Sequence, residues 1–396
     1  MTIYEILNVG QGDSIIIRPP QHCDFNGKTL IVDLGPGRYD VTKHIGEGEK
    51  VHIFLTHHDN DHVGGLRFFA GRMAQISEIT VPLYQNEITL IARAILNLKG
   101  ISTSKDCGEF VRALEEVVNN QAFIKSLLEG RGNSPKLSFA YEKRSFCGHV
   151  KCLNPPILPE TYDWIRESSL DDLRSLMQEI FTPSFAKEMT LYIHASENRY
   201  YTADSPHFNE FWLWDRQSEE PQVRKSNYVF GFIVQNTALF RQFNAGGSRK
   251  ILRKIYNNYV KCTHDVCMVL KTDFHLYDRK NTNTSMLLTG DASKKVFNRL
   301  ICEGTDLSAS YLKMPHHGSK HNMNQKILEA IAPDTAIISH NNGHFGKARD
   351  PHPNREVLEL LSRNHVKVLL TNDVIKDGLT VMEKGRHCKD YNVRIW

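Results

Sequence analysis

The stretch that decides the fold is Val51-His52-Ile53-Phe54-Leu55-Thr56-His57-His58-Asp59-Asn60-Asp61-His62-Val63-Gly64-Gly65. Its first part is mostly apolar and predicts a β-strand, and the polar part begins directly where that strand ends. A turn after a strand places side chains above the edge of the sheet, where α/β proteins usually carry their chemistry. His57, Asp59, Asp61 and His62 are potential metal ligands on this one turn, so we interpret it as a metal site. A solvated polar loop with capping aspartates is the alternative, because short motifs also match by chance.

The composition sets the class of protein. The chain has 396 residues, of which 40% are hydrophobic and 24% charged, as in a soluble globular protein with a large core. No apolar run is long enough to cross a bilayer, and Met1 to Glu5 lack the basic and apolar regions of a signal peptide. We therefore expect a cytoplasmic protein that does not contact a membrane. The net charge of +4 is compatible with an anionic substrate but does not by itself indicate nucleic acid.

The eight cysteines are scattered, and no two of them are separated by only two residues. This argues against a disulfide framework and against a cysteine-rich zinc module. We expect these thiols to be buried or incidental.

Strand-like segments occur at both ends of the chain and are separated by a long middle region. Short apolar runs bounded by glycine, proline and polar residues predict strands over residues 3 to 9, 14 to 17, 30 to 33, 51 to 55, 149 to 153, 266 to 270, 285 to 289, 311 to 314, 336 to 339 and 368 to 370. Residues 292 to 300 read as a helix. Polar residues repeatedly follow these strands.

The middle region has a different pattern of apolar residues. Apolar residues recur at helical spacing over residues 86 to 130, which predicts amphipathic helices. Residues 157 to 262 read as a mixed segment with a helix over residues 170 to 180 and a basic helix over residues 249 to 254. Aromatic strands are expected near Tyr192, Phe211, Trp212 and Trp214. No internal repeat is visible, so we interpret both stretches as insertions.

Two further features point to the same site as the first turn. Asp291 follows a strand and a glycine, and His316 and His317 follow another strand. A two-metal hydrolytic centre needs two ligand sets joined by a bridging carboxylate and hydroxide. Asp291 is the natural bridge in such a centre.

These motifs, taken in order, resemble the metallo-β-lactamase superfamily, and within it the soluble hydrolase domain of ComEC-type competence proteins. The resemblance rests on Asn8-Val9-Gly10-Gln11-Gly12-Asp13-Ser14, Leu30-Ile31-Val32-Asp33-Leu34-Gly35, Thr56 to Gly65, Leu288-Thr289-Gly290-Asp291, Met314-Pro315-His316-His317-Gly318-Ser319 and His352-Pro353. It covers residues 1 to 83, 146 to 156 and 263 to 396, and Asp59 is the feature specific to the ComEC-like branch, because many other members have histidine there.

The resemblance implies an α/β fold, the αββα sandwich of this superfamily, with a helical insertion and a mixed α+β insertion. The first half of the core would be residues 1–83 and the second half residues 263–396. The helical insertion would be residues 84–145, a core strand would follow at 146–156, and the second insertion would be residues 157–262.

The resemblance also implies ligands, residue by residue. His57 and Asp59 would bind one metal ion, Asp61, His62 and His317 the other, and Asp291 would bridge them. The branch usually has Asn-Asp before the strand that precedes Gly290, where this chain has His264-Asp265. Either of these two could be a ligand, and a simple turn is equally compatible with the sequence.

The ligand types narrow the cofactor to two divalent ions. Oxygen and imidazole donors without thiolate are compatible equally with zinc and manganese, with magnesium at one site as a further option. Asp13 and Asp33 are expected nearby as carboxylates that orient metal-bound histidines, although each could serve only its local turn.

Catalysis is expected to involve Asp61, His316 and His352. His316, Ser319 and Lys320 could contact a phosphate, and His352 could protonate a leaving oxygen as a general acid. A histidine in a surface loop is the alternative for His352.

Phosphodiesters suit two metals because both ions can clamp the non-bridging oxygens, and the ComEC-like branch is linked to DNA handling. Our first hypothesis is therefore a nuclease with DNA or RNA as substrate. The basic helix, with Tyr256 and Tyr259 nearby, could follow a nucleic-acid backbone and stack bases, although a solvated helix face is the commoner role of such basic residues. A small-molecule hydrolase acting on a cyclic nucleotide, lactone or thioester is the second hypothesis. A non-catalytic metal-binding partner protein is the third. A protein partner, for instance in bacterial defence, is expected, but no partner-binding motif is visible.

Overall fold

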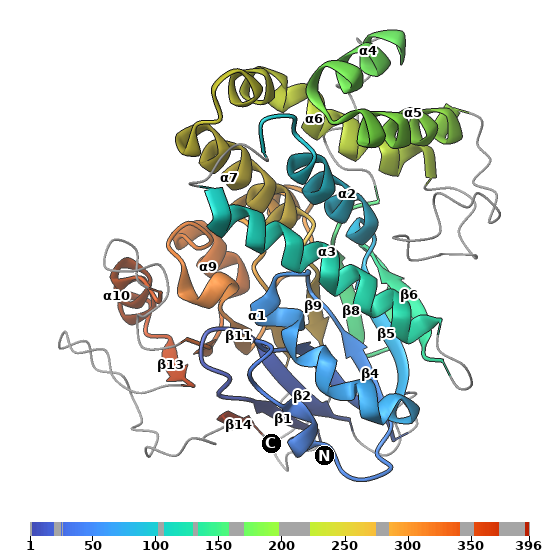
Figure 1. Cartoon of the computed structure of the whole chain (residues 1–396). Coiled ribbons are helices and arrows are strands. Elements are labelled where there is room, and N and C mark those ends of the chain that lie inside the picture. Colours follow the sequence, from blue (N-terminus) through green and yellow to red (C-terminus); the bar gives the residue numbers. More distant parts are fainter. Residues whose placement is uncertain are drawn as a thin grey trace. The chain divides into compact units, whose positions relative to one another are not determined.

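The structure is a computed structural model of the chain (Figure 1). It describes residues 2–19, 25, 27–101, 107–129, 134–157, 170–197, 222–274, 285–340, 352–371 and 393–395. The chain divides into two compact units, of which unit 1 comprises Met1–Pro82, Leu127–Pro155 and His264–Trp396 and unit 2 comprises Leu83–Ser126 and Pro156–Thr263.

Unit 1 is built on two mixed sheets of seven strands each. The first sheet has the order β14-β1-β2-β3-β4-β5-β6. Its strands are β1 (Ile3–Ile6), β2 (Ser14–Arg18), β3 (Thr29–Leu34), β4 (Val51–Phe54), β5 (Ile76–Pro82), β6 (Lys136–Ala140) and β14 (Val393–Ile395). The pairs from β14 to β3 are antiparallel and those from β3 to β6 are parallel. The carboxyl ends of β3 and β4 therefore meet at one edge, which carries Asp33 and the turn that begins at Thr56.

The second sheet has the order β13-β12-β11-β10-β9-β8-β7. Its strands are β7 (Ser145–Phe146), β8 (Val150–Asn154), β9 (Val269–Thr272), β10 (Met286–Leu288), β11 (Tyr311–Lys313), β12 (Thr335–Ile338) and β13 (Lys367–Leu370). The strands from β10 to β13 are parallel, and the rest pair antiparallel. Asp291 and His316 come after the carboxyl ends of β10 and β11, at the same edge of this sheet.

The two sheets pack face to face through an apolar core. One cluster of buried side chains joins Ile15 and Phe54 of the first sheet to Leu270 and Leu288 of the second. Leu287 lies next to Leu288 on β10 but belongs to a different cluster, because successive side chains of a strand point to opposite faces.

The second cluster lies on the other face of the second sheet, where helices cover it. These helices are α8 (Lys294–Cys302), α9 (Gln325–Ile331) and α10 (Arg355–Arg363), and they contribute the buried residues Phe297, Ile327 and Leu361. The first sheet carries α1 (Asn60–Val63) and the 3-10 helices η1 (Val41–His44) and η2 (Gly64–Gln75) between its strands, and η6 (Pro315–Gly318) follows β11. The expected α/β sandwich of two sheets with helices and insertions is confirmed.

Unit 2 is helical among the residues that the structure describes. Its helices are α2 (Gln85–Leu96), α3 (Gly108–Leu128), α4 (Leu170–Ile180), α5 (Pro183–Glu197), α6 (Gln222–Gly246) and α7 (Arg249–Asp265), of which α3 and α7 end just inside the bounds of unit 1. None of the described helices combines the length and the apolar character needed to span a membrane.

Two expectations about the middle region differ from the structure. Tyr192 was expected in a strand but lies in α5, where Phe185, Met189 and Tyr192 are buried at the spacing of a helix, so the strand prediction was wrong. Phe211, Trp212 and Trp214 lie outside the described residues. The expected helical insertion of residues 84–145 contains β6, which pairs in parallel with β5, because Leu137 and Phe139 alternate with polar residues and form a short edge strand.

Candidate metal centre

The turn after β4 brings its four potential ligands to the edge of the first sheet. His57 precedes α1, Asp59 is the residue before its first turn, and Asp61 and His62 lie within it. His57 and His62 are only 1% and 0% exposed. The alternative of a solvated polar loop is therefore wrong for the histidines, because both rings are shielded from water. Buried imidazoles need polar partners within the protein.

Asp291 reaches the same place from the second sheet, on a turn that only glycine can make. Gly290 has a φ of +46°, and a Cβ built on it would lie 2.7 Å from both Cys267 Sγ and Thr56 Oγ1. Any side chain would collide with these buried atoms and strain the backbone. The missing Cβ lets the loop of Asp291 rest directly on the turn after β4.

His316 and His317 are held by an unusual backbone. Their φ angles are +46° and +55°, in the left-handed region that residues other than glycine rarely adopt. The backbone N–H of His316 donates to the carbonyl of Gly290 (3.1 Å), which ties their turn to the loop of Asp291. Strained residues of this kind cluster at functional sites, where the surroundings hold them in place.

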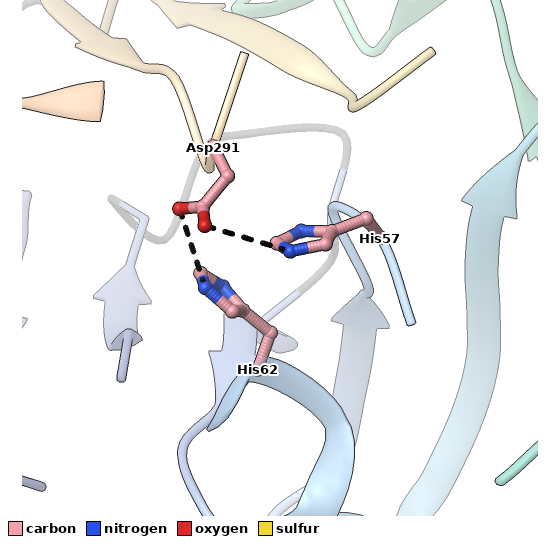
Figure 2. Close-up of side chains that lie close together, drawn as sticks. All are labelled: His57, His62 and Asp291. Carbon is pink, nitrogen blue, oxygen red and sulfur yellow. Dashed lines mark ion pairs between the residues drawn. The ribbon is translucent and has the colours of Figure 1, made fainter. Parts of the chain in front are cut away.

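The carboxylate of Asp291 lies at the centre of the site, with each oxygen facing different histidines. Asp291 Oδ1 lies 3.4 Å from His62 Nε2 and 4.0 Å from His317 Nε2. Asp291 Oδ2 lies 3.8 Å from His57 Nε2, 3.8 Å from His264 Nε2 and 3.6 Å from His316 Nε2. Figure 2 shows His57 and His62 pointing toward the two sides of this carboxylate.

Two separate groups of possible ligands surround this carboxylate. Within each group, the ligand atoms all lie within 4.8 Å of one another. The first ligand set is His57, Asp59 and His264, and the second ligand set is Asp61, His62 and His317. These sets contain the residues predicted for the two ions, with His264 added to the first, and the ligand roles stay predictions. His57, His62 and Asp291 also form one such group, so the two sets adjoin each other. His264, Asp291 and His316 form a further group of the same kind.

His264 and Asp265 lie in different surroundings. His264 lies in the last turn of α7 and is 7% exposed, with Nε2 facing Asp291. The side chain of Asp265 accepts from the hydroxyl of Ser293 and lies 3.9 Å from Lys295 Nζ. Asp265 is thus engaged elsewhere, and His264 is the one of the pair that points into the site, on a helix rather than in a turn.

Hydrogen bonds at Nδ1 orient several of these rings. His62 Nδ1 donates to Asp33 Oδ2 (2.8 Å), and His317 Nδ1 donates to the carbonyl of Ser339 (3.1 Å). A carbonyl can only accept, so the Nδ1 of His317 carries the proton and its Nε2 presents a lone pair. Among the described residues, Nε2 of His57, Nε2 of His62 and Oδ1 of Asp291 are buried without a hydrogen-bond partner. In the neutral rings these Nε2 atoms would offer lone pairs to bound cations, which fits a metal centre.

The charges of the site depend on one another. Burial alone would raise the pKa of Asp291, but His316, His62 and His317 hold this pKa well below its usual range. Burial would lower the pKa of His62, but the carboxylates of Asp291, Asp33 and Asp61 raise it well above its usual value. Because these carboxylates lie in a site shielded from water, positive charge must balance them. Either protons or divalent cations can supply this charge.

The expected carboxylates Asp13 and Asp33 lie beside the site. Asp33 accepts from His62, as described above. Asp13 forms a buried ion pair with Lys313 (2.7 Å) and lies 3.7 Å from His317 Nδ1, while its backbone N–H donates to the carbonyl of Asp61 (3.2 Å). Each of these two carboxylates thus lies next to a histidine of the second ligand set.

Sequence reasoning missed two residues of this neighbourhood. Lys313, the partner of Asp13, is fully buried on β11, and a lysine in a buried strand was the signal that it has a charged partner. Cys267 is 0% exposed, with Sγ 3.7 Å from His57 Nδ1 and accepting from the backbone N–H of Asp291 (3.2 Å). Cys267 is buried, as expected for these thiols, but it also contacts the site, whereas Cys302 is exposed.

The residues expected to act in catalysis or to contact a phosphate differ in their surroundings. His352 is 4% exposed, and its ring centroid lies 4.9 Å from that of His316, so the surface-loop alternative was wrong. Ser319 is buried, and its hydroxyl accepts from the backbone N–H of His321 (3.2 Å). Lys320 Nζ lies 2.9 Å from Glu356 Oε1, which leaves it engaged away from the carboxylate of Asp291.

The expected track on α7 receives little support. Tyr259 is buried, and Tyr256 packs against Phe110 with ring centroids 5.1 Å apart, so neither ring is a free platform for a base. Arg249 is paired with Glu109 (2.7 Å). The basic side chains further along the helix stay exposed.

Comparisons with known proteins agree with this architecture. A family model described as the metallo-beta-lactamase superfamily matches residues 7–73. The chain is also 35% identical over 88 residues to ComE operon protein 3 of Bacillus subtilis (strain 168), in a match that covers 22% of this chain and 11% of that protein. The matched length is thus a small part of the relative. The family match, this relative and the two packed mixed sheets together support a metallo-β-lactamase fold with a ComEC-like relation.

Proposed function

We propose that this protein is a phosphodiesterase that acts through two divalent metal ions, with a nucleic acid as its substrate. The observation that carries the proposal is the position of Asp291, whose two carboxylate oxygens face two separate ligand sets. A carboxylate shared in this way is the usual bridge of a two-metal hydrolytic site.

The residues present fit such a pair of ions. The first ligand set supplies two imidazole nitrogens and one carboxylate, and so does the second ligand set. With Asp291 added, each ion would have four protein ligands, which leaves room for water or substrate in an expanded coordination shell. The donors are nitrogen and oxygen only, which suits zinc or manganese, and Cys267 Sγ faces the Nδ1 side of His57 rather than Nε2.

When bound, two divalent ions would activate water as a nucleophile and neutralise charge on the phosphate. The protein's own part is to place the donors and to keep bulk water away, since Asp291, His62 and His317 are all nearly fully buried. Electrostatic interactions in such a site are stronger than in water, because the local dielectric constant is low.

Proton transfer to the leaving oxygen would be the task of the histidines beside the ligands. His316 is half-buried, and its Nδ1 lies 3.3 Å from the side-chain oxygen of Asn322. The amide nitrogen of Asn322 donates to the carbonyls of Asp291 and Ala292, which fixes the amide so that its oxygen faces His316. His352 packs edge-on against His316, so the two rings can hold a proton next to the metal ligands.

The choice of nucleic acid rests on the resemblance to ComEC-type proteins and on the chemistry of a phosphate clamped by two cations. A cyclic nucleotide, lactone or thioester is the second candidate, since the same site would also activate water against these groups. The proposal includes a protein partner, such as one acting in bacterial defence, only as the biological context in which the activity would occur.

The test begins with protein stripped by a chelator and reloaded with zinc or manganese. Metal content by mass spectrometry should approach two ions per chain, and the loaded protein should hydrolyse bis(p-nitrophenyl) phosphate and cleave single-stranded DNA, double-stranded DNA or RNA. The variant Asp291→Asn should lose most of both signals, because it removes the shared charge. The matched control is Asp306→Asn, which alters an exposed aspartate paired with Lys271 and should behave as the wild type.

The outcomes separate the alternatives. Hydrolysis of a cyclic nucleotide or lactone with all nucleic acids intact would replace the nuclease proposal by the small-molecule one. Absence of bound metal after loading with either ion would reject the metal centre itself and favour a non-catalytic role.

A further inference from the structure

The hydroxyl group of Thr56 lies between two histidines of the site. We propose that Thr56 is a positioning residue through which a single carboxylate, Asp33, fixes the orientation of one histidine in each ligand set, His57 in the first and His62 in the second. This inference rests on the proposed function, because it concerns the same metal centre.

Asp33 is the acceptor on which the arrangement depends. Its Oδ1 accepts from the backbone N–H of Thr56 (2.7 Å), and its Oδ2 accepts from both the Thr56 hydroxyl (2.7 Å) and His62 Nδ1 (2.8 Å). Asp33 and Thr56 are each 1% exposed, so water does not compete for these bonds. Asp33 therefore contacts His62 directly and reaches toward His57 through the hydroxyl.

The direction of the hydrogen bonds sets the tautomer of His57. A threonine hydroxyl has one proton, and here it is donated to Asp33 Oδ2. The oxygen of Thr56 can then only accept from His57 Nδ1, which lies 3.1 Å away. The Nδ1 of His57 thus carries a proton, so the neutral ring would leave the lone pair on Nε2, the atom that faces Asp291. His62 reaches the same tautomer by donating to Asp33 itself.

Cys267 offers His57 a second contact, but a weaker one. Its Sγ lies 3.7 Å from His57 Nδ1, and a thiol sulfur is a poor acceptor compared with a hydroxyl oxygen. This sulfur also accepts from the backbone N–H of Asp291. Cys267 therefore supports the packing around His57, while Thr56 supplies the stronger bond.

Packing leaves the Thr56 hydroxyl little freedom. The carbonyl of Thr56 accepts from the backbone N–H of Met268 (2.8 Å), and a Cβ on Gly290 would come within 2.8 Å of its Cβ. Asp33 has a φ of +59°, an unfavourable conformation for an aspartate that the surrounding bonds must offset. Because packing already restricts the Thr56 side chain, its hydroxyl can fix the orientation of His57 with little further loss of conformational entropy.

The expected size of the effect follows from the chemistry of metal-bound histidine. Loss of the group that accepts from the outer ring nitrogen usually weakens metal binding by about 10- to 100-fold. The substitution Thr56→Val keeps the shape of the side chain and removes only its oxygen. It leaves Asp33 bonded to His62, so only the ion of the first ligand set should lose affinity.

The test compares Thr56→Val with Thr56→Ser, which restores the hydroxyl. Zinc affinities of the two ligand sets are measured by competition with a chromophoric chelator, and thermal unfolding checks the fold. Thr56→Val should weaken one ion by about 10- to 100-fold and leave the other within about threefold, and Thr56→Ser should recover most of the loss. Thr80→Val is the matched control, because Thr80 is an equally buried threonine that bonds His52 and Ser138.

A spectroscopic measurement tests the same inference first in the wild type and then in two variants. Long-range proton–nitrogen spectra of zinc-loaded protein labelled at histidine should show the proton on Nδ1 of both His57 and His62. Asp33→Asn should disturb both rings, whereas Thr56→Val should disturb His57 alone.

Three results would overturn the inference. They are zinc bound through Nδ1 of His57 in the wild type, wild-type affinity for both ions in Thr56→Val, and equal losses in Thr56→Val and Thr56→Ser. Failure of the proposed function looks different. The wild type would then bind no zinc at all, or would bind two zinc ions with the expected tautomers and leave nucleic acids intact.

Discussion

His52 gives a prediction about stability, since it is a titratable group buried in the strand that carries the metal turn. It lies on β4, is 3% exposed, and its Nε2 lies 2.7 Å from Thr80 Oγ1. Its ring stacks on Phe54 with centroids 4.2 Å apart. A protonated ring would be a charge within an apolar core, so folding should favour the neutral form.

The charges around His52 do not reverse this effect. Burial is the main cause that lowers its pKa from 6.5 to about 4. Glu78, whose carboxylate lies 3.9 Å away, raises the pKa, and Lys28, Lys136 and Arg144 lower it further.

The shift fixes the sign and the size of the effect. Between pH 6.5 and 4 the unfolded chain binds a proton at this residue that the folded chain refuses, so stability falls as the pH falls. The contribution is fully present above pH 6.5. About 2 kcal/mol of it is lost by pH 5, and about 3 kcal/mol is lost below pH 4.

The assay is urea unfolding of wild type and His52→Gln from pH 8 to pH 4, with hydrogen exchange of β4 and β5 used to follow unit 1. Other histidines titrate as well, so the informative quantity is the difference between the two proteins. The variant should be less stable at pH 8, because it loses the stacked ring, and the difference should shrink by about 3 kcal/mol toward pH 4. A difference that stays constant with pH would refute the reasoning.

Three further predictions concern the site. Asp291→Asn should reduce the bound zinc from two ions toward one or none, as measured by mass spectrometry, while unfolding shows a folded chain. Lys313→Met should destabilise unit 1 by about 3–5 kcal/mol, because it leaves the Asp13 carboxylate buried and unpaired. The double variant Lys313→Met/Asp13→Asn should recover much of this lost stability in urea unfolding. Equal losses of stability in the single and the double variant would contradict the ion-pair argument. Gly290→Ala should lower both the melting temperature and the zinc affinity, since its Cβ would meet Cys267 Sγ at 2.7 Å; a wild-type melting temperature would show that the loop moves aside freely.

The sequence predicted best what is local. The turn after β4 carries its ligands within six residues, and the strands before Asp291 and His316 are short apolar runs that end at those polar residues. Because the carboxyl ends of parallel strands lie at one edge of a sheet, the meeting of these motifs could be anticipated. The division of ligands around Asp291 followed from the resemblance, and the structure arranges them in two groups of the same kind.

Partnerships across the chain could not be read in the same way. Lys313 and Asp13 lie 300 positions apart, and nothing local to either residue identifies the other. Cys267 looked like one apolar residue among several in its strand. His264 faces Asp291 because of where α7 ends and the direction in which it runs. The prediction of a turn at this position provides neither.

The long middle region shows another limit. The segment of α6 from Tyr228 to Ile233 is almost entirely buried, and a helix that is apolar all round has no periodic stripe to detect. The same ambiguity led to the wrong strand assignment for Tyr192, since aromatic residues favour strands unless packing decides otherwise.

The order of the ligands along the chain has a consequence for how the protein is made. His317 follows His62 by about 250 residues, so the two are synthesised well apart in time. At about 5–20 residues per second, the second ligand set stays incomplete for on the order of 10–50 s. Neither proposed ion site can therefore be complete before the segment with Asp291 has been made, and the site of the second ion must also wait for His317.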